Sequence, residues 1–195
     1  MPGASSLNAV TPPSHAAAAA PSPWVARWLP GARAGGRVLD FACGSGRHTR
    51  FAADLGFSVL AVDRDPAALS SLQGTGVCLL QEDLEGGRWS FAAERFDAVI
   101  CTNYLYRPRL GLLCGLLQPG GMLLYETFAI GNAHYGRPSN PAYLLRRGEL
   151  AASLQRAGLH LLAFEDGFAA RPGPARIQRA VALCPPFEPQ DLPLV

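Results

Sequence analysis

Apolar residues in this chain fall into short, continuous runs that alternate with segments of helical spacing. Runs of Val, Leu, Ile and Phe bounded by turn residues are typical of strands that are buried on both faces. We expect strands at 38–42, 58–62, 77–81, 96–102, 122–127, 159–165 and 177–183. We expect helices at 47–55, 66–72, 109–117 and 149–157.

The order of these elements predicts an α/β domain. Helices separate most of the early strands, which predicts a parallel sheet covered on both faces. The last two strands follow each other without a helix between them, so we expect an antiparallel hairpin at one edge. Gln118-Pro119-Gly120-Gly121 predicts a turn before the fifth strand.

The first 21 residues have a different composition from the rest of the chain. Residues 1–21 are mainly Ala, Pro and Ser with few large side chains, so we expect a disordered tail. Order is expected to begin near Pro23, where Trp24 and Trp28 have helical spacing. A single domain over residues 22–195 is the resulting prediction.

Composition and charge narrow the classes of function. Hydrophobic residues make up 49% of the chain and the net charge is +2, which favours a globular protein and gives no indication of a nucleic-acid partner. All seventeen basic residues are arginine, which excludes Walker-type phosphate loops and lysine Schiff bases. No apolar run reaches the length of a membrane span, so no membrane partner is expected.

The five cysteines are scattered and odd in number, with no CxxC pair. This spacing favours neither a disulfide framework nor a zinc site, and we predict no metal. Cys78, Cys101 and Cys184 lie inside apolar runs, where free cysteine behaves as a small hydrophobic residue. The pattern indicates a reducing compartment, and we expect a cytoplasmic protein.

A glycine-rich turn after the first expected strand is the strongest functional signal. Residues 38–47 read VLDFACGSGR, with Gly44 and Gly46 between a strand and a helix. Such a turn lies in the crevice at the carboxyl ends of the strands. A dinucleotide site needs a third Gly three residues after Gly46, but Thr49 stands there. Asp40 adds a carboxylate, which suits a cationic ligand better than a phosphate.

Two further carboxylates follow the next two strands. Asp63 ends the second strand about 20 residues beyond the turn, where it can accept hydrogen bonds from ribose hydroxyls. Asp83 follows the third strand and can accept from an adenine amino group, while Leu84 can pack near the ring. S-adenosylmethionine carries an ammonium and a sulfonium but no phosphate, so it fits this set.

These motifs resemble those of the class I S-adenosylmethionine-dependent methyltransferases. The turn from Asp40 to Gly46 is similar to the family's first motif, and Asp63 and Asp83 to its second and third acidic positions. The fourth strand and the Gln118–Gly121 turn also match, and Arg47-His48 resembles the small tellurite-resistance-type group. The resemblance implies a Rossmann-like, doubly wound, seven-stranded sheet that is mostly parallel, with an antiparallel edge hairpin. One departure is Ala42, which stands where Gly is common and for which we expect a negative φ.

The cofactor set follows from the turn, the acidic positions and the segment after the fourth strand. We expect S-adenosylmethionine to be bound by Asp40, Ala42, Gly44, Gly46, Asp63, Asp83, Leu84 and Asn103. The acceptor is expected to be a small molecule, with thiols, amines, carboxylates and metalloid oxyanions all open.

Two segments are expected to surround the acceptor. The first, Thr102 to Arg107, follows the fourth strand and contains Asn103, Tyr104 and Tyr106. The second runs from Glu126 to Gly148 and is long and polar-aromatic, which in a compact domain favours a functional loop. We expect this excursion to be a lid over the acceptor. The candidate catalytic residues are Tyr104, His134, Tyr135 and Arg137.

Two other functions remain open at this level. A non-catalytic protein could keep the cofactor fold as a binding or interaction module. A nicotinamide-dependent oxidoreductase is the second alternative, against which the missing third Gly argues.

Overall fold

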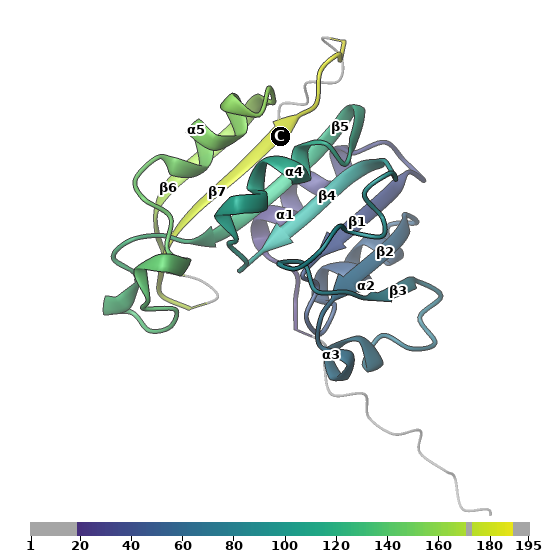
Figure 1. The fold of residues 1–195 in the computed structure, drawn as a ribbon, viewed down its shortest axis with the longest axis horizontal. Coiled ribbons are helices and arrows are strands. Elements are labelled where there is room, and N and C mark those ends of the chain that lie inside the picture. Colours follow the sequence, from purple (N-terminus) through teal and green to yellow (C-terminus); the bar gives the residue numbers. More distant parts are fainter. Residues whose placement is uncertain (1–18, 171–172, 189–195) are drawn as a thin grey trace, which may run out of the picture.

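The computed structural model describes residues 19–170 and 173–188. It contains one seven-stranded sheet in the order β3-β2-β1-β4-β5-β7-β6 (Figure 1). The strands are β1 (Arg37–Phe41), β2 (Ser58–Asp63), β3 (Cys78–Gln81), β4 (Phe96–Thr102), β5 (Leu117–Phe128), β6 (His160–Ala169) and β7 (Ala175–Leu183). The expected fold class, including the antiparallel edge, is confirmed. The expected disorder of residues 1–21 concerns mainly residues that lie outside the described ranges, and it stays a prediction.

Helices and 3₁₀ turns connect and cover the strands. The helices are α1 (Pro23–Trp28), α2 (Arg47–Asp54), α3 (Pro66–Ser70), α4 (Leu110–Cys114) and α5 (Glu149–Arg156). The 3₁₀ turns are η1 (Leu29–Gly31), η2 (Arg107–Arg109), η3 (Asn132–His134) and η4 (Pro141–Tyr143). Among the described residues, none of the helices combines the length and hydrophobicity that crossing a bilayer requires.

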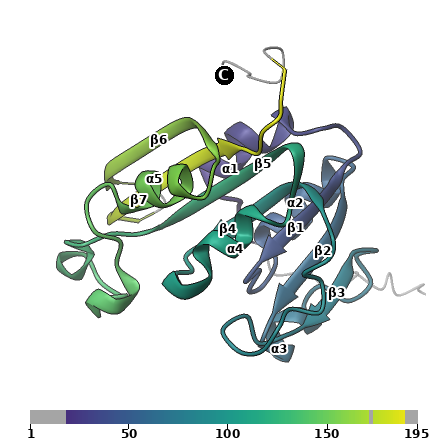
Figure 2. The ribbon, with the colours of Figure 1, turned by 45° about the horizontal axis from the view of Figure 1, so that its top comes forward.

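Strand direction brings the carboxyl ends of five strands to one edge of the sheet. β1 pairs in parallel with β2 and β4, β2 with β3, and β4 with β5. β7 runs antiparallel to both β5 and β6, at the end of the sheet opposite β3 (Figure 2). The chain order reverses between β1 and β4, which is where open α/β sheets bind ligands.

Alternating strand residues build a core on each face of the sheet. Leu39 packs in one cluster, which also holds buried residues of α4 and α5. Its neighbour Val38 packs in the other, with Trp24 and Trp28 of α1 and Ala52 of α2. Neighbouring residues of a strand point to opposite faces, so the continuous apolar runs are explained by a sheet that is covered on both sides.

Four local expectations need correction. The expected helix 109–117 is split into η2 and the short helix α4. Residues 118–121 lie within the bounds of β5, although the pairing with β4 is irregular there. Ala42 has a positive φ of 57°, not the negative value expected. Cys78 is exposed on the edge strand β3, whereas Cys101 is buried as expected.

Candidate functional site

A cavity of about 570 Å³ opens at the carboxyl ends of the parallel strands. This volume is within the usual range for small-molecule and cofactor sites. Seven predicted site residues line it: Ala42, Gly44, Asp63, Asp83, Leu84, Asn103 and Tyr104. The walls also include Cys43, Ser45, Arg47, His48, Arg64, Glu85, Thr102, Leu105, Thr127, Phe128, Pro138 and Tyr143.

The glycine-rich turn is fixed by the carboxylate at the end of β2. Asp63 Oδ2 accepts a hydrogen bond from the Gly44 backbone N–H at 2.8 Å. Its other oxygen accepts from the Asp65 N–H at 3.0 Å. Each carboxylate oxygen has a second lone-pair direction, so Asp63 can still accept from a ligand. A Cβ added at Gly44 would meet nothing within 4 Å, so a ligand can approach this backbone closely.

Two residues on the cavity wall adopt the left-handed backbone region without being glycine. Ala42 follows β1 with φ 57°, and Asn103 follows β4 with φ 56°. The Asn103 N–H donates to the Glu126 carbonyl at 2.8 Å, which holds the β4 end against β5. A left-handed alanine costs roughly 1–2 kcal/mol, and such strain concentrates at functional sites.

Two predicted cofactor residues do not line the cavity. Asp40 is buried and accepts from Thr49 Oγ1 at 2.6 Å, so it ties β1 to α2. Burial raises the pKa of the Asp40 carboxyl to about 6, against the opposing effect of the Thr49 hydrogen bonds. Gly46 instead shapes the turn, because its φ is 76° and a Cβ there would collide with the side chain of the buried Leu72.

A buried histidine, His48, lines the cavity although it was not among the site residues expected from the sequence. His48 Nε2 accepts the Ser22 backbone N–H at 3.1 Å. The proton must then be on Nδ1, which lies 3.4 Å from Thr102 Oγ1. Burial, helped by nearby Arg47, lowers the pKa of His48 to about 3, so the ring is neutral. Its position directly after the glycine-rich turn was the one available signal.

Ser22 and Glu126 form the outer part of this network. Ser22 Oγ donates to Glu126 Oε1 at 2.9 Å and also caps α1. Glu126 forms an ion pair with Arg179 of β7 at 3.5 Å. Glu126 therefore joins α1 to the sheet and is not on the cavity wall, contrary to its expected place beside the acceptor.

Tyr104 lies on the cavity wall after β4. Its ring packs edge-on against Phe41, with the ring centres 5.5 Å apart. Its hydroxyl is buried and has no hydrogen-bond partner among the residues that the structure describes. Burial, reinforced by the negative charge of Glu85, raises the pKa of Tyr104. The hydroxyl thus stays protonated and is a hydrogen-bond donor.

The loop after β3 contributes Asp83, Leu84 and Glu85 to the cavity wall. Asp83 is exposed and accepts from the Glu85 N–H at 3.0 Å. Leu84 is buried, and its carbonyl accepts from Trp89 Nε1 at 3.0 Å and from Arg109 Nη1 at 3.1 Å. These hydrogen bonds to the Leu84 carbonyl therefore fix the loop, while Asp83 lines the cavity.

The excursion after β5 lines the cavity, but not with its candidate catalytic residues. His134, Tyr135 and Arg137 are exposed and do not line the cavity, and Tyr106 is also outside its wall. The Tyr135 ring packs on Phe168 of β6, with ring centres 5.0 Å apart. Pro138 and Tyr143 line the cavity in their place.

The residues on the wall fit S-adenosylmethionine. Asp63 and Asp83 offer carboxylates, the buried hydroxyl of Tyr104 lacks a partner, and Gly44 leaves space for a ligand. The ammonium, sulfonium and adenosine groups of S-adenosylmethionine are suited to these carboxylate acceptors and to this hydroxyl donor. No group of His, Cys, Asp and Glu that could hold a metal was found within the described ranges.

Comparison with known proteins gives the same picture. A family profile described as "Methyltransferase domain" matches residues 38–121. A curated relative, "Ubiquinone biosynthesis O-methyltransferase" of Xanthomonas axonopodis pv. citri (strain 306), is 34% identical over 66% of this chain and 64% of its own length. The same enzyme of Xanthomonas euvesicatoria pv. vesicatoria (strain 85-10) is 33% identical with the same coverage. The chain thus spans less than two thirds of the length of either curated relative.

Solved structures share the fold at low sequence identity. TehB from Haemophilus influenzae superposes with a TM-score of 0.63 and 17% identity, over 77% of this chain and 58% of that one. A TehB-like SAM-dependent methyltransferase from Corynebacterium glutamicum superposes with a TM-score of 0.62 and 21% identity, over 83% of this chain and 88% of that one. A SAM-dependent methyltransferase from Methanosarcina mazei superposes with a TM-score of 0.65 and 18% identity, over 85% of this chain and 98% of that one.

Proposed function

The chain belongs to the class I S-adenosylmethionine-dependent methyltransferases, and we propose that it transfers a methyl group to a small molecule bound beside Thr127 and Tyr143. The observation that carries this proposal is the single cavity wall that joins Asp63 and Asp83 to residues of the excursion after β5. Such a cavity has room for a donor at one end and an acceptor at the other.

The cofactor would lie along the carboxyl ends of β1, β2 and β3. Asp63 would accept from the ribose hydroxyls, while Asp83 and Leu84 would hold the adenine. We assign Tyr104 to this end, because Asp83 and Glu85 are among the charges that act on its hydroxyl. This differs from the catalytic role expected from the sequence.

S-adenosylmethionine, when bound, supplies a methyl group already activated by the sulfonium. The chain's own residues then position the acceptor and exclude water from it. His48 is poorly suited to act as a base, because its Nε2 lone pair is occupied by the Ser22 N–H. Tyr104 stays protonated. The proposal is therefore catalysis mainly by orientation, with an acceptor that is nucleophilic in its own right or loses its proton to water.

We favour a hydroxyl group as the methyl acceptor. The curated relatives are named O-methyltransferases, which supports this choice over thiols, amines, carboxylates and metalloid oxyanions. Because the chain covers only part of those relatives, their substrate is not carried over. The small net charge of +2 also favours a small molecule over nucleic acid.

The test is a transfer assay with isotopically labelled methyl donor. The panel contains 3,4-dihydroxybenzoate as hydroxyl probe, with a matched small thiol, amine, carboxylate and tellurite, and mass spectrometry identifies the product. We expect label on a ring hydroxyl of 3,4-dihydroxybenzoate and not on its carboxylate, two products that fragmentation distinguishes. Label on another member alone would overturn the hydroxyl assignment, and cofactor binding without transfer to any member would favour a non-catalytic module.

We further propose a cytoplasmic location. All five cysteines are free thiols, as is usual in a reducing compartment. Fractionation of expressing cells should place the protein with cytoplasmic markers, and recovery with the periplasm would contradict this.

A further inference from the structure

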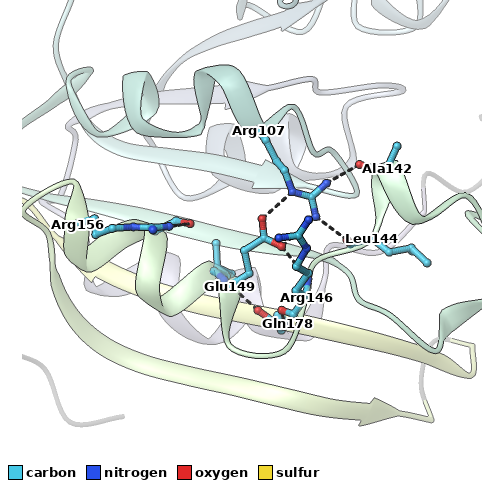
Figure 3. Close-up of polar contacts among 9 residues, drawn as sticks. Arg107, Ala142, Leu144, Arg146, Glu149, Arg156 and Gln178 are labelled. Atoms are coloured by element: carbon cyan, nitrogen blue, oxygen red, sulfur yellow. Dashed lines mark hydrogen bonds and ion pairs between the residues drawn. The ribbon is translucent and has the colours of Figure 1, made fainter.

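Arg107 binds two backbone carbonyls that flank a cavity residue. Arg107 (Figure 3) lies in η2. It follows the cavity residues Asn103 and Tyr104 in the chain. Its Nη1 donates to the Ala142 carbonyl at 2.6 Å, and its Nη2 donates to the Leu144 carbonyl at 2.7 Å. Tyr143, between these two residues, lines the cavity. One guanidinium therefore binds the carbonyl groups of the residues on both sides of Tyr143.

The same guanidinium is paired with Glu149 at the start of α5. Nε donates to Oε1 at 2.6 Å and Nη2 to Oε2 at 2.9 Å, so the pair is bidentate. A bidentate pair fixes the plane of the guanidinium as well as its position. The Arg107 side chain is 32% exposed and that of Glu149 is 17% exposed, so water screens the pair only partly.

Further contacts connect Glu149 to the sheet. Its Oε2 accepts the Arg146 backbone N–H at 2.7 Å. The buried Gln178 of β7 donates to the Arg146 carbonyl at 2.6 Å and accepts the Leu150 N–H at 3.0 Å. Figure 3 shows these groups converging between η2, η4 and α5. The segment that carries Tyr143 is thus held to η2, and through Glu149 and Arg146 the same contacts extend to α5 and β7.

We infer that Arg107 is a positioning residue that fixes Tyr143 against the acceptor end of the cavity. The inference rests on the proposed function, because it assigns Tyr143 to the acceptor. Arg107 does not line the cavity, so it acts through the segment it holds. A lysine could keep the ion pair, but its single ammonium does not match the fork that reaches two carbonyls and a carboxylate at once.

The test compares Arg107→Lys with Glu149→Gln and Arg156→Lys. Glu149→Gln removes the ion pair but leaves the carbonyl contacts in place. Arg156→Lys is the matched control, because this exposed arginine of α5 makes one side-chain bond, to Ser153. For each variant we would measure the dissociation constant of S-adenosylhomocysteine, KM for 3,4-dihydroxybenzoate, and amide exchange at Tyr143 and Leu144 with S-adenosylhomocysteine bound.

For Arg107→Lys we expect KM for the hydroxyl probe to rise at least fivefold, with cofactor affinity within twofold of wild type. Amide exchange at Tyr143 and Leu144 should be at least tenfold faster. Glu149→Gln should change the KM and the amide exchange less than Arg107→Lys does. Arg156→Lys should change neither the KM nor the exchange. Unchanged exchange in Arg107→Lys, or a parallel loss of cofactor affinity, would overturn the inference. If wild type does not methylate the probe, the proposed function fails for this acceptor class, and the exchange data still decide the role of Arg107.

Discussion

Asp63 and Gly44 are joined by a 2.8 Å hydrogen bond between the carboxylate at the end of β2 and the backbone N–H of the glycine-rich turn. One side chain thus sets the shape of the turn and also faces the cavity. Residues 19 positions apart in the sequence become one structural unit because β1 and β2 are parallel neighbours. We therefore expect that a change in the shape of the turn alters cofactor affinity.

The variant Asp63→Ala should weaken binding of S-adenosylhomocysteine by at least tenfold. It removes acceptors for the Gly44 N–H and for the ribose hydroxyls, and hydrogen bonds to charged groups contribute roughly 1.5–3 kcal/mol each. Calorimetric titration measures the change. Asp54→Ala, an exposed carboxylate at the end of α2, serves as the control and should bind like wild type. Equal affinity of both variants for S-adenosylhomocysteine would show that Asp63 does not bind the cofactor.

Tyr104→Phe should separate stability from binding. The Tyr104 hydroxyl is buried without a partner, so its removal should leave the melting temperature of the free protein unchanged or slightly higher. Cofactor affinity should fall about three- to tenfold, because a neutral hydrogen bond contributes about 0.5–1.5 kcal/mol. Tyr106→Phe, outside the cavity wall, is the matched control. A lower melting temperature with unchanged affinity would make the hydroxyl a structural group.

Asp40→Asn should make the protein more stable at neutral pH but not in acid. Burial raises the pKa of Asp40 from 3.8 to about 6, so the folded protein binds this proton more tightly than the unfolded chain does. The stabilisation by protonated Asp40 is present below pH 3.8 and is lost as the pH rises through 6. Two pKa units correspond to roughly 3 kcal/mol.

Urea denaturation at several pH values measures this effect. The asparagine oxygen can still accept from Thr49, so the free energy of unfolding of Asp40→Asn should exceed that of wild type increasingly from pH 4 to pH 7. A difference that does not vary with pH would show that Asp40 titrates normally.

Tyr143→Ala should lower turnover more than Tyr135→Ala does. Tyr143 lines the cavity, whereas Tyr135 packs on Phe168 outside it. We expect at least a tenfold loss of kcat/KM for Tyr143→Ala, equivalent to about 1.4 kcal/mol of transition-state stabilisation. Initial rates with 3,4-dihydroxybenzoate give the comparison, and S-adenosylhomocysteine affinity should change little in either variant. A larger loss for Tyr135→Ala would instead support the expectation from the sequence that Tyr135 is a catalytic residue of a lid over the acceptor.

The sheet could be predicted because its signals are local. Continuous apolar runs marked β1, β2 and β4 to within a residue or two, and Asp63 and Asp83 follow strands whose ends must meet at one edge. The end of β5 was expected to within one residue, but the expected place of Glu126 beside the acceptor was wrong. Glu126 pairs with Arg179 of the antiparallel strand β7, and no local pattern shows such a partner strand.

The missed site residues depend on distant contacts. His48 is held by Ser22, 26 positions away, and Arg107 by groups 35 to 42 positions away. A lone histidine or arginine in a sequence gives no indication of such partners. The φ of Ala42 was wrongly expected to be negative, because steric preference alone does not reveal that the surrounding turn forces a strained alanine.

The central claim is tested most directly by calorimetric titration of the wild-type protein with S-adenosylmethionine, S-adenosylhomocysteine and NAD⁺. The account predicts one site per chain with a roughly micromolar dissociation constant for the first two, near −8 kcal/mol, and no binding of NAD⁺. Absence of S-adenosylmethionine binding at millimolar concentration, or tighter binding of NAD⁺, would contradict it.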